Sequence, residues 1–345
     1  MSENQKFSRG SKRKLTYFVA FIVLLFGGLS AGWYWASGKL DERAKMLAAN
    51  LASQGKNLDC INQEVRGYPF RLGVFCDGVT FADASAGVNI SGKGFRSAAQ
   101  LYRPGHFVAE LDSPYDLVVP GLAPLTIDWN NLKSSSNIGT SGFKRLSVVA
   151  DQISVSANDF GQRDLLGSVQ ELQFHTRISE ENDGKDMDLA LSADQWQIDD
   201  NEANLIEPVS FSIDGQLKDG VAIIQSGQTL LDVLKANGGR ADLKGFVFST
   251  KSGGMLKVSG PIEISRSGFL SGALSLDIEN PQKLINYATS VFPPIASDLE
   301  NVAQYLEAFA DRSDNKIAIK DLKIQIKDGN IFVGFLQVGE IPRLF

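Results

Sequence analysis

Apolar and polar positions divide the chain into two regions of different periodicity. Residues 15–35 hold no charged side chain. At about 1.5 Å of rise per helical residue, this run covers the roughly 30 Å hydrocarbon core of a bilayer. From about residue 57 onward, apolar residues instead recur at every second position. The pattern predicts one transmembrane helix followed by a chain rich in β-strands.

The residues around the apolar run predict its orientation. Basic side chains precede it at Lys6, Arg9, Lys12, Arg13 and Lys14. Such a leader stays in the cytoplasm, so we expect a cytoplasmic N-terminus, a single span in a bacterial inner membrane and a periplasmic bulk. A cleavable signal peptide is the alternative, and Ala31, Ala36 and Ser37 leave it open. The run exceeds the roughly 7–15 residues of a signal-peptide core, which favours a permanent anchor.

A helical stretch directly after the span is predicted to continue the membrane helix as a short stalk. Leu40, Ala44, Leu47 and Leu51 recur at helical spacing between charged residues. We therefore divide the chain into a cytoplasmic basic leader, a transmembrane helix, a juxtamembrane helix and a β-rich periplasmic domain, over residues 1–14, 15–35, 36–56 and 57–345. A seam inside the last part is placed near residue 220.

The β-rich part shows short alternating runs bounded by Gly, Asn, Asp and Ser, which predict antiparallel strands joined by hairpins. Two helical stretches interrupt them, over residues 225–237 and over residues 281–309, the second broken at Pro293 and Pro294. The predicted fold class is mainly β (α+β), with a long antiparallel meandering sheet and two inserted helices. The pattern does not distinguish a curved sheet from a sandwich.

Composition and charge narrow the range of partners. The chain carries 34 basic and 40 acidic side chains, and without the leader its formal net charge falls from −6 to about −10. An acidic exterior argues against nucleic acid as a partner. The exported part is long enough to bury one large core or two ordinary ones.

The two cysteines, Cys60 and Cys76, both follow the span. In an oxidising compartment we expect them to form a disulfide. Two buried thiols in a reducing compartment are the alternative. We expect no metal site, because the two histidines, His106 and His175, lie far from the cysteines in sequence.

Catalytic motifs are sparse. The sequence contains no Gly-x-Ser-x-Gly elbow and no Gly-rich phosphate loop, and its Ser-x-x-Lys matches read as chance. His175 falls in an alternating run and His106 in a predicted turn. We expect no catalytic residue, no cofactor and no enzyme activity. An envelope hydrolase is the interpretation that a convergence of Ser, Asp and His in the fold would revive.

The alternating sheet must have an apolar face, covered by helices, by a second sheet or by something other than protein. Strand alternation places candidate ligand-facing side chains at Val74, Phe81, Leu189, Leu191, Phe246 and Phe248. Acyl chains suit such a face, because burying each methylene contributes about 0.8 kcal/mol. A second sheet packed on the first is the alternative and leaves no ligand site.

One short motif carries a family resemblance. It comprises Gly67, Tyr68, Pro69, Phe70 and Arg71. With the strand at residues 79–81 it resembles the G-[FY]-P-F-R signature of a family of membrane-anchored envelope proteins of alphaproteobacteria, domain of unknown function 2125. Gly67 permits a turn, Pro69 fixes its own φ, and Arg71 is expected to position structure where a strand begins. The resemblance is motif-specific over about 20 residues, and the order of features matches over nearly the whole chain.

That family is in turn similar to AsmA-like proteins, which share an N-terminal anchor and an extended sheet with an apolar groove and are implicated in moving lipids between the two envelope membranes. The resemblance implies a protein that binds phospholipid or another apolar ligand and supports envelope lipid transport or homeostasis. The alternative is a non-enzymatic envelope scaffold or assembly factor whose sheet edges pair with a partner protein.

Overall fold

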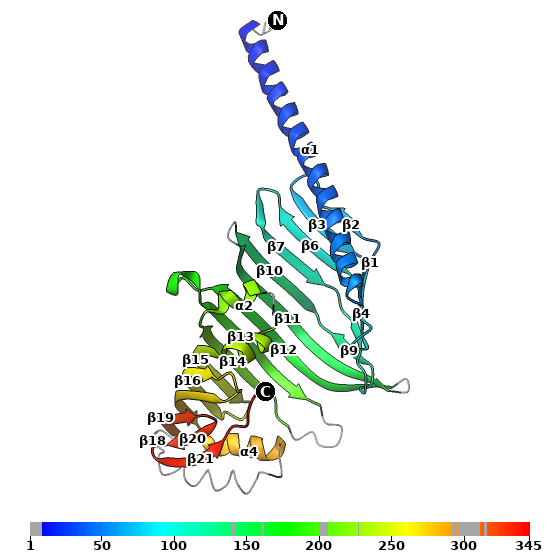
Figure 1. Cartoon of the computed structure of the whole chain (residues 1–345). Coiled ribbons are helices and arrows are strands. Elements are labelled where there is room, and N and C mark those ends of the chain that lie inside the picture. Colours follow the sequence, from blue (N-terminus) through cyan, green and yellow to red (C-terminus); the bar gives the residue numbers. More distant parts are fainter. Residues whose placement is uncertain are drawn as a thin grey trace, which may run out of the picture.

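The computed structural model describes residues 9–139, 142–159, 162–199, 206–226, 228–291, 294, 311–313 and 316–345. These residues form one long helix, three shorter helices and one long antiparallel sheet that curves along its length (Figure 1). The mainly β fold class is confirmed. All 21 strands of the described residues belong to a single open sheet, so the curved sheet and not the sandwich is the arrangement found.

Helix α1 runs from Arg9 to Ser53 without a break. It is long and apolar enough to cross a membrane, which is consistent with a single-pass anchor. Its first half stands clear of the sheet, and its second half packs on β1, β2 and β3 (Figure 1). Trp33 is buried at the start of this contact, and Leu40, Ala44 and Leu51 are half-buried along it.

The first part of the sheet is a meander of long, bent strands. Each is divided into two segments by one to three irregular residues: β1 (Lys56–Ile61) and β2 (Glu64–Arg66), β3 (Arg71–Cys76) and β4 (Gly78–Asp83), β5 (Val88–Gly92) and β6 (Phe95–Gln100), β7 (Arg103–Leu111) and β8 (Tyr115–Val118), and β9 (Leu125–Asp128) and β10 (Asn131–Gly139). Each segment pairs with the matching segment of the next strand, and both β9 and β10 pair with one edge of β11 (Gly142–Asp159).

The second part continues from β11 strand by strand. Its elements are β12 (Gln162–Ile178), β13 (Met187–Ile198), β14 (Val209–Leu217), β15 (Gly239–Thr250), β16 (Met255–Ile264), β17 (Leu270–Glu279), β18 (Asp311–Ser313), β19 (Lys316–Lys327), β20 (Asn330–Val333) and β21 (Leu336–Glu340), with a 3₁₀ turn at Asn182–Gly184. Strands β14 and β15, on either side of residue 220, are directly paired. The division into domains and the seam near residue 220 stay predictions.

A line of irregular residues, which we call the crease, crosses the sheet from the β1 strand to β13. Because of it, apolar side chains on both sides of the line point to the same face of the sheet. Asn62, Gln152 and Gln195 have positive φ angles of 52°, 50° and 49°. At Gln195, β13 gains a residue relative to β14, so that Ala193 pairs with Phe211 and Trp196 pairs with Val209. Ala193 and Trp196 are three positions apart and yet share a face, which an uninterrupted strand does not allow.

The inserted helices differ from the prediction in number. The expected single helix at residues 225–237 is two short helices, α2 (Gly220–Ser226) and α3 (Leu230–Asn237). The break has a local cause, because the Thr229 hydroxyl caps α3 by accepting from the Asp232 N–H at 3.2 Å. Helix α4 (Pro281–Val291) confirms the start of the other helical stretch, whose apolar stripe from residue 295 to 309 lies outside the described residues.

Candidate functional site

One face of the sheet carries an unbroken row of apolar side chains. Directly paired residues point to the same side of a sheet, so the register traces a row from strand to strand. We call this first row the floor row; from β3 to β19 it runs through Cys76, Phe95, Leu111, Leu132, Ala150, Leu172, Ala193, Phe211, Phe248, Leu256, Ile278 and Ile319. The side chains of the floor row therefore stay apolar through twisted, bent and bulged strands alike.

Parallel rows extend this surface on both sides. The row two residues along each strand consists of Val148, Phe174, Leu191, Ile213, Phe246, Val258, Leu276 and Leu322. On the other side of the crease, paired apolar residues include Tyr115, Ile127 and Val155, and further out Leu58, Phe81, Ile90, Leu117 and Leu125. Together with the floor row, these rows form what we call the apolar face.

Burial on the apolar face is incomplete. In the floor row Ala193 and Ile319 are each 2% exposed, but Leu172, Phe211 and Phe248 are only half-buried, as are Phe174, Leu191 and Ile213 in the next row. A second protein layer would bury both rows. Among the described elements, α1 packs on β1–β3 and α4 on β15 and β16, where Tyr287 lies 5.6 Å from Phe248. Much of the apolar face between these helices is therefore only half-buried.

The six candidate ligand-facing residues all lie on the apolar face. Phe81 pairs with Leu58 and Ile90. Val74 lies two residues before Cys76 on β3, so both point to the same face. Leu189, Leu191, Phe246 and Phe248 form a second group on β13 and β15, about six to eight strands away across the sheet. The structure thus divides the candidates between two places, and their role in binding stays a prediction.

Sequence reasoning missed most of the apolar face. Phe174, Val148 and Ile213 alternate as visibly as the chosen residues, and their strands were recognised. What alternation could not supply is the register that aligns them into rows. The positive φ at Gln152 and Gln195 also reverses the alternation within β11 and β13, so counting by two assigns residues beyond the crease to the wrong side.

The opposite face is polar and tied together by ion pairs. Arg96 contacts Asp112 at 2.7 Å and Glu110 at 3.3 Å, and Asp188 accepts from Arg177 at 3.0 Å. These positions alternate with the floor row along the same strands. The sheet therefore has two chemically distinct sides, one suited to water and one suited to apolar groups.

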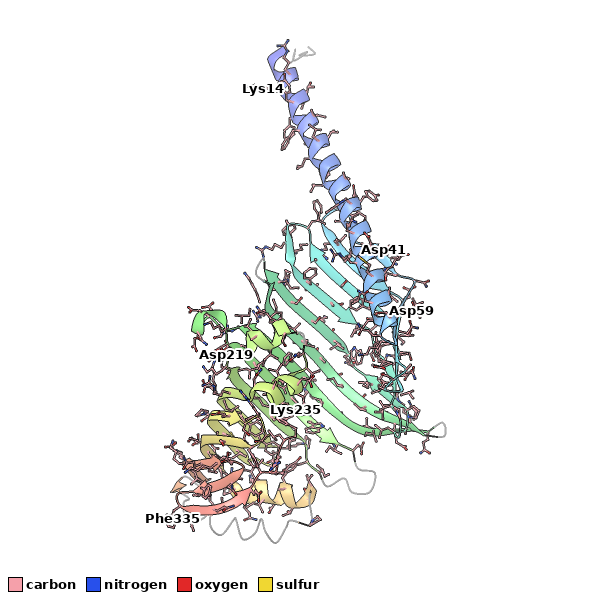
Figure 2. The ribbon with its side chains drawn as sticks, in the orientation of Figure 1. Lys14, Asp41, Asp59, Asp219, Lys235 and Phe335 are labelled. Carbon is pink, nitrogen blue, oxygen red and sulfur yellow. A yellow bond between two sulfur atoms is a disulfide. The ribbon has the colours of Figure 1, made fainter. Side chains whose placement is uncertain are left out.

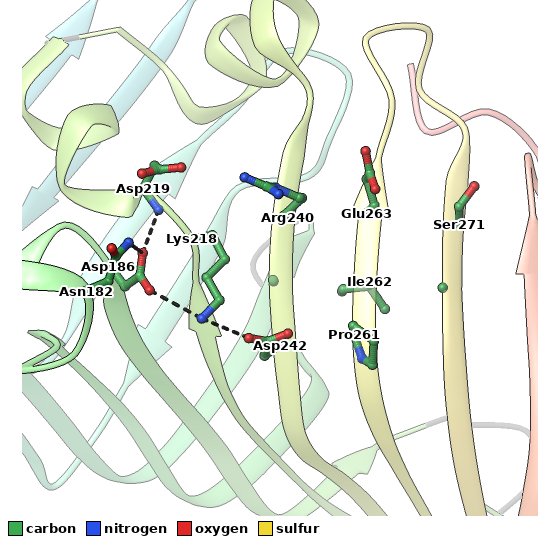
Figure 3. A pocket seen from close by; sticks show the side chains of 12 residues that line it. Asn182, Asp186, Lys218, Asp219, Arg240, Asp242, Pro261, Ile262, Glu263 and Ser271 are labelled. Carbon is green, nitrogen blue, oxygen red and sulfur yellow. Dashed lines mark hydrogen bonds and ion pairs between the residues drawn. The ribbon is translucent and has the colours of Figure 1, made fainter.

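A polar pocket of about 520 Å³ lies at the strand ends near α2 (Figure 3). Asp186 lies at one side of it, is 1% exposed and accepts from the Asp219 N–H at 2.9 Å and from Asn182 at 3.1 Å. Lys218 bridges Asp186 at 3.3 Å and Asp242 at 2.9 Å. Burial raises the pKa of Asp186, but these three donors outweigh it and hold the pKa below its ordinary value.

The contacts of Asp186 in this pocket tie the strand ends together. Within the described residues no cluster of His, Cys, Asp and Glu has the arrangement of a metal site. His175 lies in β12 as expected, with Nε2 3.0 Å from Gln173 Oε1. His106 was predicted in a turn and lies instead in β7, where it pairs with Asn137.

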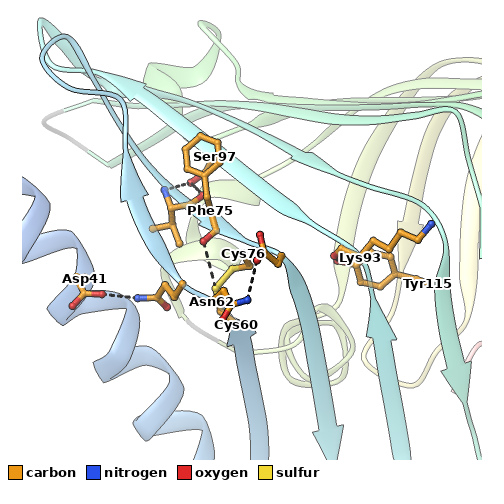
Figure 4. The surroundings of a disulfide bond; sticks show 11 residues. Asp41, Cys60, Asn62, Phe75, Cys76, Lys93, Ser97 and Tyr115 are labelled. Carbon is orange, nitrogen blue, oxygen red and sulfur yellow. Dashed lines mark hydrogen bonds between the residues drawn. A yellow bond between two sulfur atoms is a disulfide. The ribbon is translucent and has the colours of Figure 1, made fainter.

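Cys60 and Cys76, expected to pair, form a disulfide between β1 and β3 with a Cα–Cα distance of 5.3 Å (Figure 4). The bond joins two segments that do not pair directly, because β1 pairs with β4 and β3 with β6. Beside it the Asn62 amide donates to Asp77 at 2.9 Å. The disulfide therefore fixes the crease at the end of the sheet that carries α1.

The Gly67–Arg71 motif connects this end of the sheet to α1. Gly67 has a φ of 114°, and a Cβ there would lie 2.7 Å from the Arg71 carbonyl oxygen, so the hairpin requires glycine. The Trp33 indole donates to the Arg71 carbonyl at 2.7 Å, and its ring meets the Tyr68 ring edge-on at 5.6 Å. The motif positions the helix, as expected for a structural role.

Comparison with known proteins places the chain in a family. No curated protein and no solved structure matches it. Residues 33–342 match a family described as "Uncharacterized protein conserved in bacteria (DUF2125)". The matched region begins at the buried Trp33 and ends after β21, so it contains the whole described sheet, the disulfide and the hairpin motif. The chain belongs to the DUF2125 family.

Proposed function

We propose that this protein is a single-pass inner-membrane protein whose periplasmic sheet binds acyl chains of phospholipid or a similar apolar ligand along the apolar face, in support of envelope lipid transport or homeostasis. The proposal includes a cytoplasmic N-terminus, an alphaproteobacterial source and an AsmA-like relationship. It assigns no catalytic step and no cofactor.

The observation that carries the proposal is the continuity of the floor row. A row from β3 to β19 crosses roughly eleven interstrand steps of about 4.8 Å, or about 53 Å along the arc. Its side chains are apolar in every strand, and the next row is half-exposed. Exposed apolar surface on this scale is rare in a soluble monomer and marks an interaction site.

Acyl chains match this surface better than a compact ligand. The apolar face is long, open and without an enclosed end among the described residues, whereas small-molecule sites are concave and enclose most of the ligand. A fully buried chain of about fifteen methylenes contributes up to about 12 kcal/mol, and partial burial along an open face retains a useful fraction. The opposite face is polar and can remain in water while acyl chains lie on the apolar face.

Photo-crosslinking in the full chain tests the proposal. A photo-reactive amino acid at Phe246 lies on the apolar face, and the same residue at Val247 points to the polar face of the same strand. We expect lipid adducts, identified by mass spectrometry, at Phe246 and not at Val247. Equal yields at both sites, or no lipid at Phe246 in a folded protein, would contradict the proposal.

The scaffold alternative keeps one specific observation in its favour. Strand β21 pairs with β20 along one edge, and its exposed residues include Leu336 and Val338, with Phe335 92% exposed in the preceding turn. An exposed apolar edge strand can pair with a strand of another protein. A photo-reactive residue at Val338 that captures one protein, with no lipid captured at Phe246, would favour the scaffold over the lipid-binding function.

A further inference from the structure

The sheet edge beside α1 presents exposed aromatic and aliphatic side chains. We define the rim as Tyr68, Phe70, Tyr102 and Ile138, which lie at the tips of neighbouring hairpins and are all exposed, Tyr102 by 69%. The tips are contiguous, because the Leu101 N–H donates to the Phe70 carbonyl at 3.0 Å. On the next strand pair, Gly105 approaches the Ile138 carbonyl so closely that a Cβ would lie 2.1 Å away.

Contacts with α1 fix the level of the rim along the predicted membrane span. The Ser30 hydroxyl donates to the Phe26 carbonyl at 2.7 Å, so the Tyr68 hydroxyl, 2.8 Å away, donates to Ser30. Ser30 precedes the end of the predicted span at Trp35 by five residues, or about 7.5 Å of helix. Interfacial apolar groups are buried about 5–10 Å into the boundary between headgroups and acyl chains.

The charges beside the rim fit lipid headgroups. Arg71 and Arg103 are exposed and directly follow Phe70 and Tyr102, and neither has an ion-pair partner among the described residues. Arginine binds phosphate through paired N–H donors, and tyrosine is enriched where an apolar environment meets water. Elsewhere on the sheet, Arg96 and Arg177 are paired with carboxylates, whereas Arg145 and Arg240 have no ion-pair partner among the described residues. At the rim, Arg71 and Arg103 place two unpaired cations at the level where headgroup phosphates would lie.

We infer that the rim inserts into the interface of the same membrane that α1 crosses, on the leaflet facing the sheet, with Arg71 and Arg103 at the level of the phosphates. The sheet then stands on the bilayer at two points, α1 and the rim, and the apolar face begins at the lipid surface. The inference rests on the membrane insertion of α1 in the proposed function and not on lipid binding by the apolar face.

Depth-dependent fluorescence quenching tests this arrangement. The native cysteines are joined in the disulfide, so one added cysteine is available for a nitrobenzoxadiazole label. Full chains carrying Tyr102→Cys, Leu24→Cys or Phe335→Cys are reconstituted into phosphatidylcholine and phosphatidylglycerol vesicles with nitroxide lipids labelled near the headgroup or near the chain end. Leu24 lies in the span, and Phe335 lies at the end of the molecule opposite Lys14 (Figure 2).

We expect the Tyr102 label to be quenched several-fold more strongly by the headgroup-level nitroxide than by the deep one, the Leu24 label to show the reverse, and the Phe335 label to respond only to aqueous iodide. A Tyr102 label that behaves like Phe335 while Leu24 is quenched overturns the rim alone. An unquenched Leu24 label overturns the anchor and the rim together. Lipid adducts at Phe246 are scored separately and bear on neither outcome.

Discussion

At the residue scale, the disulfide is the strongest local constraint. Cys60 and Cys76 enclose both the crease residue Asn62 and the Gly67–Arg71 hairpin. The bond joins β1 and β3, segments of two neighbouring bent strands, across the crease, and adds a covalent link to the hydrogen bonds between these strands. The disulfide therefore stabilises the end of the sheet that contacts α1.

Replacing both cysteines, Cys60→Ser with Cys76→Ser, is expected to lower the free energy of unfolding by about 3 kcal/mol, because the unfolded chain regains the freedom that a short closed loop removes. Chemical denaturation of the full chain under oxidising conditions measures the difference. A reductant should shift the wild-type transition by a similar amount and leave the double variant unchanged. A reductant-sensitive double variant would show that the shift has another origin.

Asp186 gives the fold a pH dependence of known sign. Its pKa lies below the ordinary value because the donors from Asp219, Asn182 and Lys218 outweigh burial. The folded state thus binds a proton more weakly than the unfolded state. Ionised Asp186 stabilises the fold above about pH 4, and this contribution is lost as the pH falls through the lowered folded-state pKa.

We expect Asp186→Asn to lower the free energy of unfolding at pH 7 by about 1–3 kcal/mol, because Lys218 loses one charged partner. The difference from wild type should shrink as the pH falls through the lowered folded-state pKa, where the wild-type carboxyl becomes protonated as well. Denaturation at several pH values measures it. Asp219→Asn is the matched control, since Asp219 joins the network through its backbone N–H. A difference that stays constant with pH would rule out the ionised carboxylate as the cause.

At the element scale, the crease depends on a few residues with left-handed backbone. Gln195 has a φ of 49° in the middle of β13, and its backbone N–H donates to the Ser210 hydroxyl at 3.0 Å. A β-branched residue tolerates this φ poorly, whereas glycine adopts it readily. The bulge keeps Ala193 and Trp196 on one face.

Substituting Gln195→Val is therefore expected to destabilise the protein by about 1–2 kcal/mol relative to Gln195→Gly. Both variants remove the same exposed amide, so their difference isolates the backbone preference. Thermal or chemical unfolding of the full chain supplies the comparison. Equal stability of the two variants would mean that β13 accommodates a regular strand at this point.

Sequence patterns predicted the types of element well and their alignment poorly. The apolar run at residues 15–35 predicted the first half of α1, and period-two runs predicted the strands, because helix and strand periodicity are local properties. The crease was not predicted, since an extra residue in β13 becomes visible only against β14. The Thr229 cap at the start of α3 is a local signal, and helical periodicity alone does not contain it.

For the candidate site, too, the local features could be predicted from the sequence and their alignment across strands could not. The disulfide was anticipated from the two cysteines. The structural role expected of Arg71 stays a prediction for its side chain, because the contact with Trp33 is made by its backbone carbonyl. All six ligand-facing candidates lie on the apolar face, but four fall in one cluster and two at the other end. Rows such as the floor row depend on pairing between residues as distant as Ile278 and Ile319. No local pattern contains that information.

At the scale of the whole molecule, the open sheet has one face suited to water and one suited to apolar groups. Its polar face is solvated and cross-linked by ion pairs, and its apolar face is continuous from the α1 end to β19. A closed barrel or a sandwich would bury this face and remove the surface. The open sheet leaves this face available along its length, so the proposed ligand binding is a property of the whole sheet and not of one pocket.

A single charge on the apolar face tests that continuity. Leu191 is half-buried between Phe174 and Ile213, and Ser192 lies on the polar face between Gln173 and Ser212. A lysine at position 191 can extend its ammonium group to water while its stem covers the strand, so the fold is retained. Its charge must nevertheless lie against any acyl chain that follows the row. With the photo-reactive residue at Phe246, we expect Leu191→Lys to reduce lipid adducts about tenfold, equivalent to about 1.4 kcal/mol, and Ser192→Lys to leave them unchanged. Equal adduct yields in the two variants would show that bound lipid does not cross β13, and that the apolar face acts as separate sites.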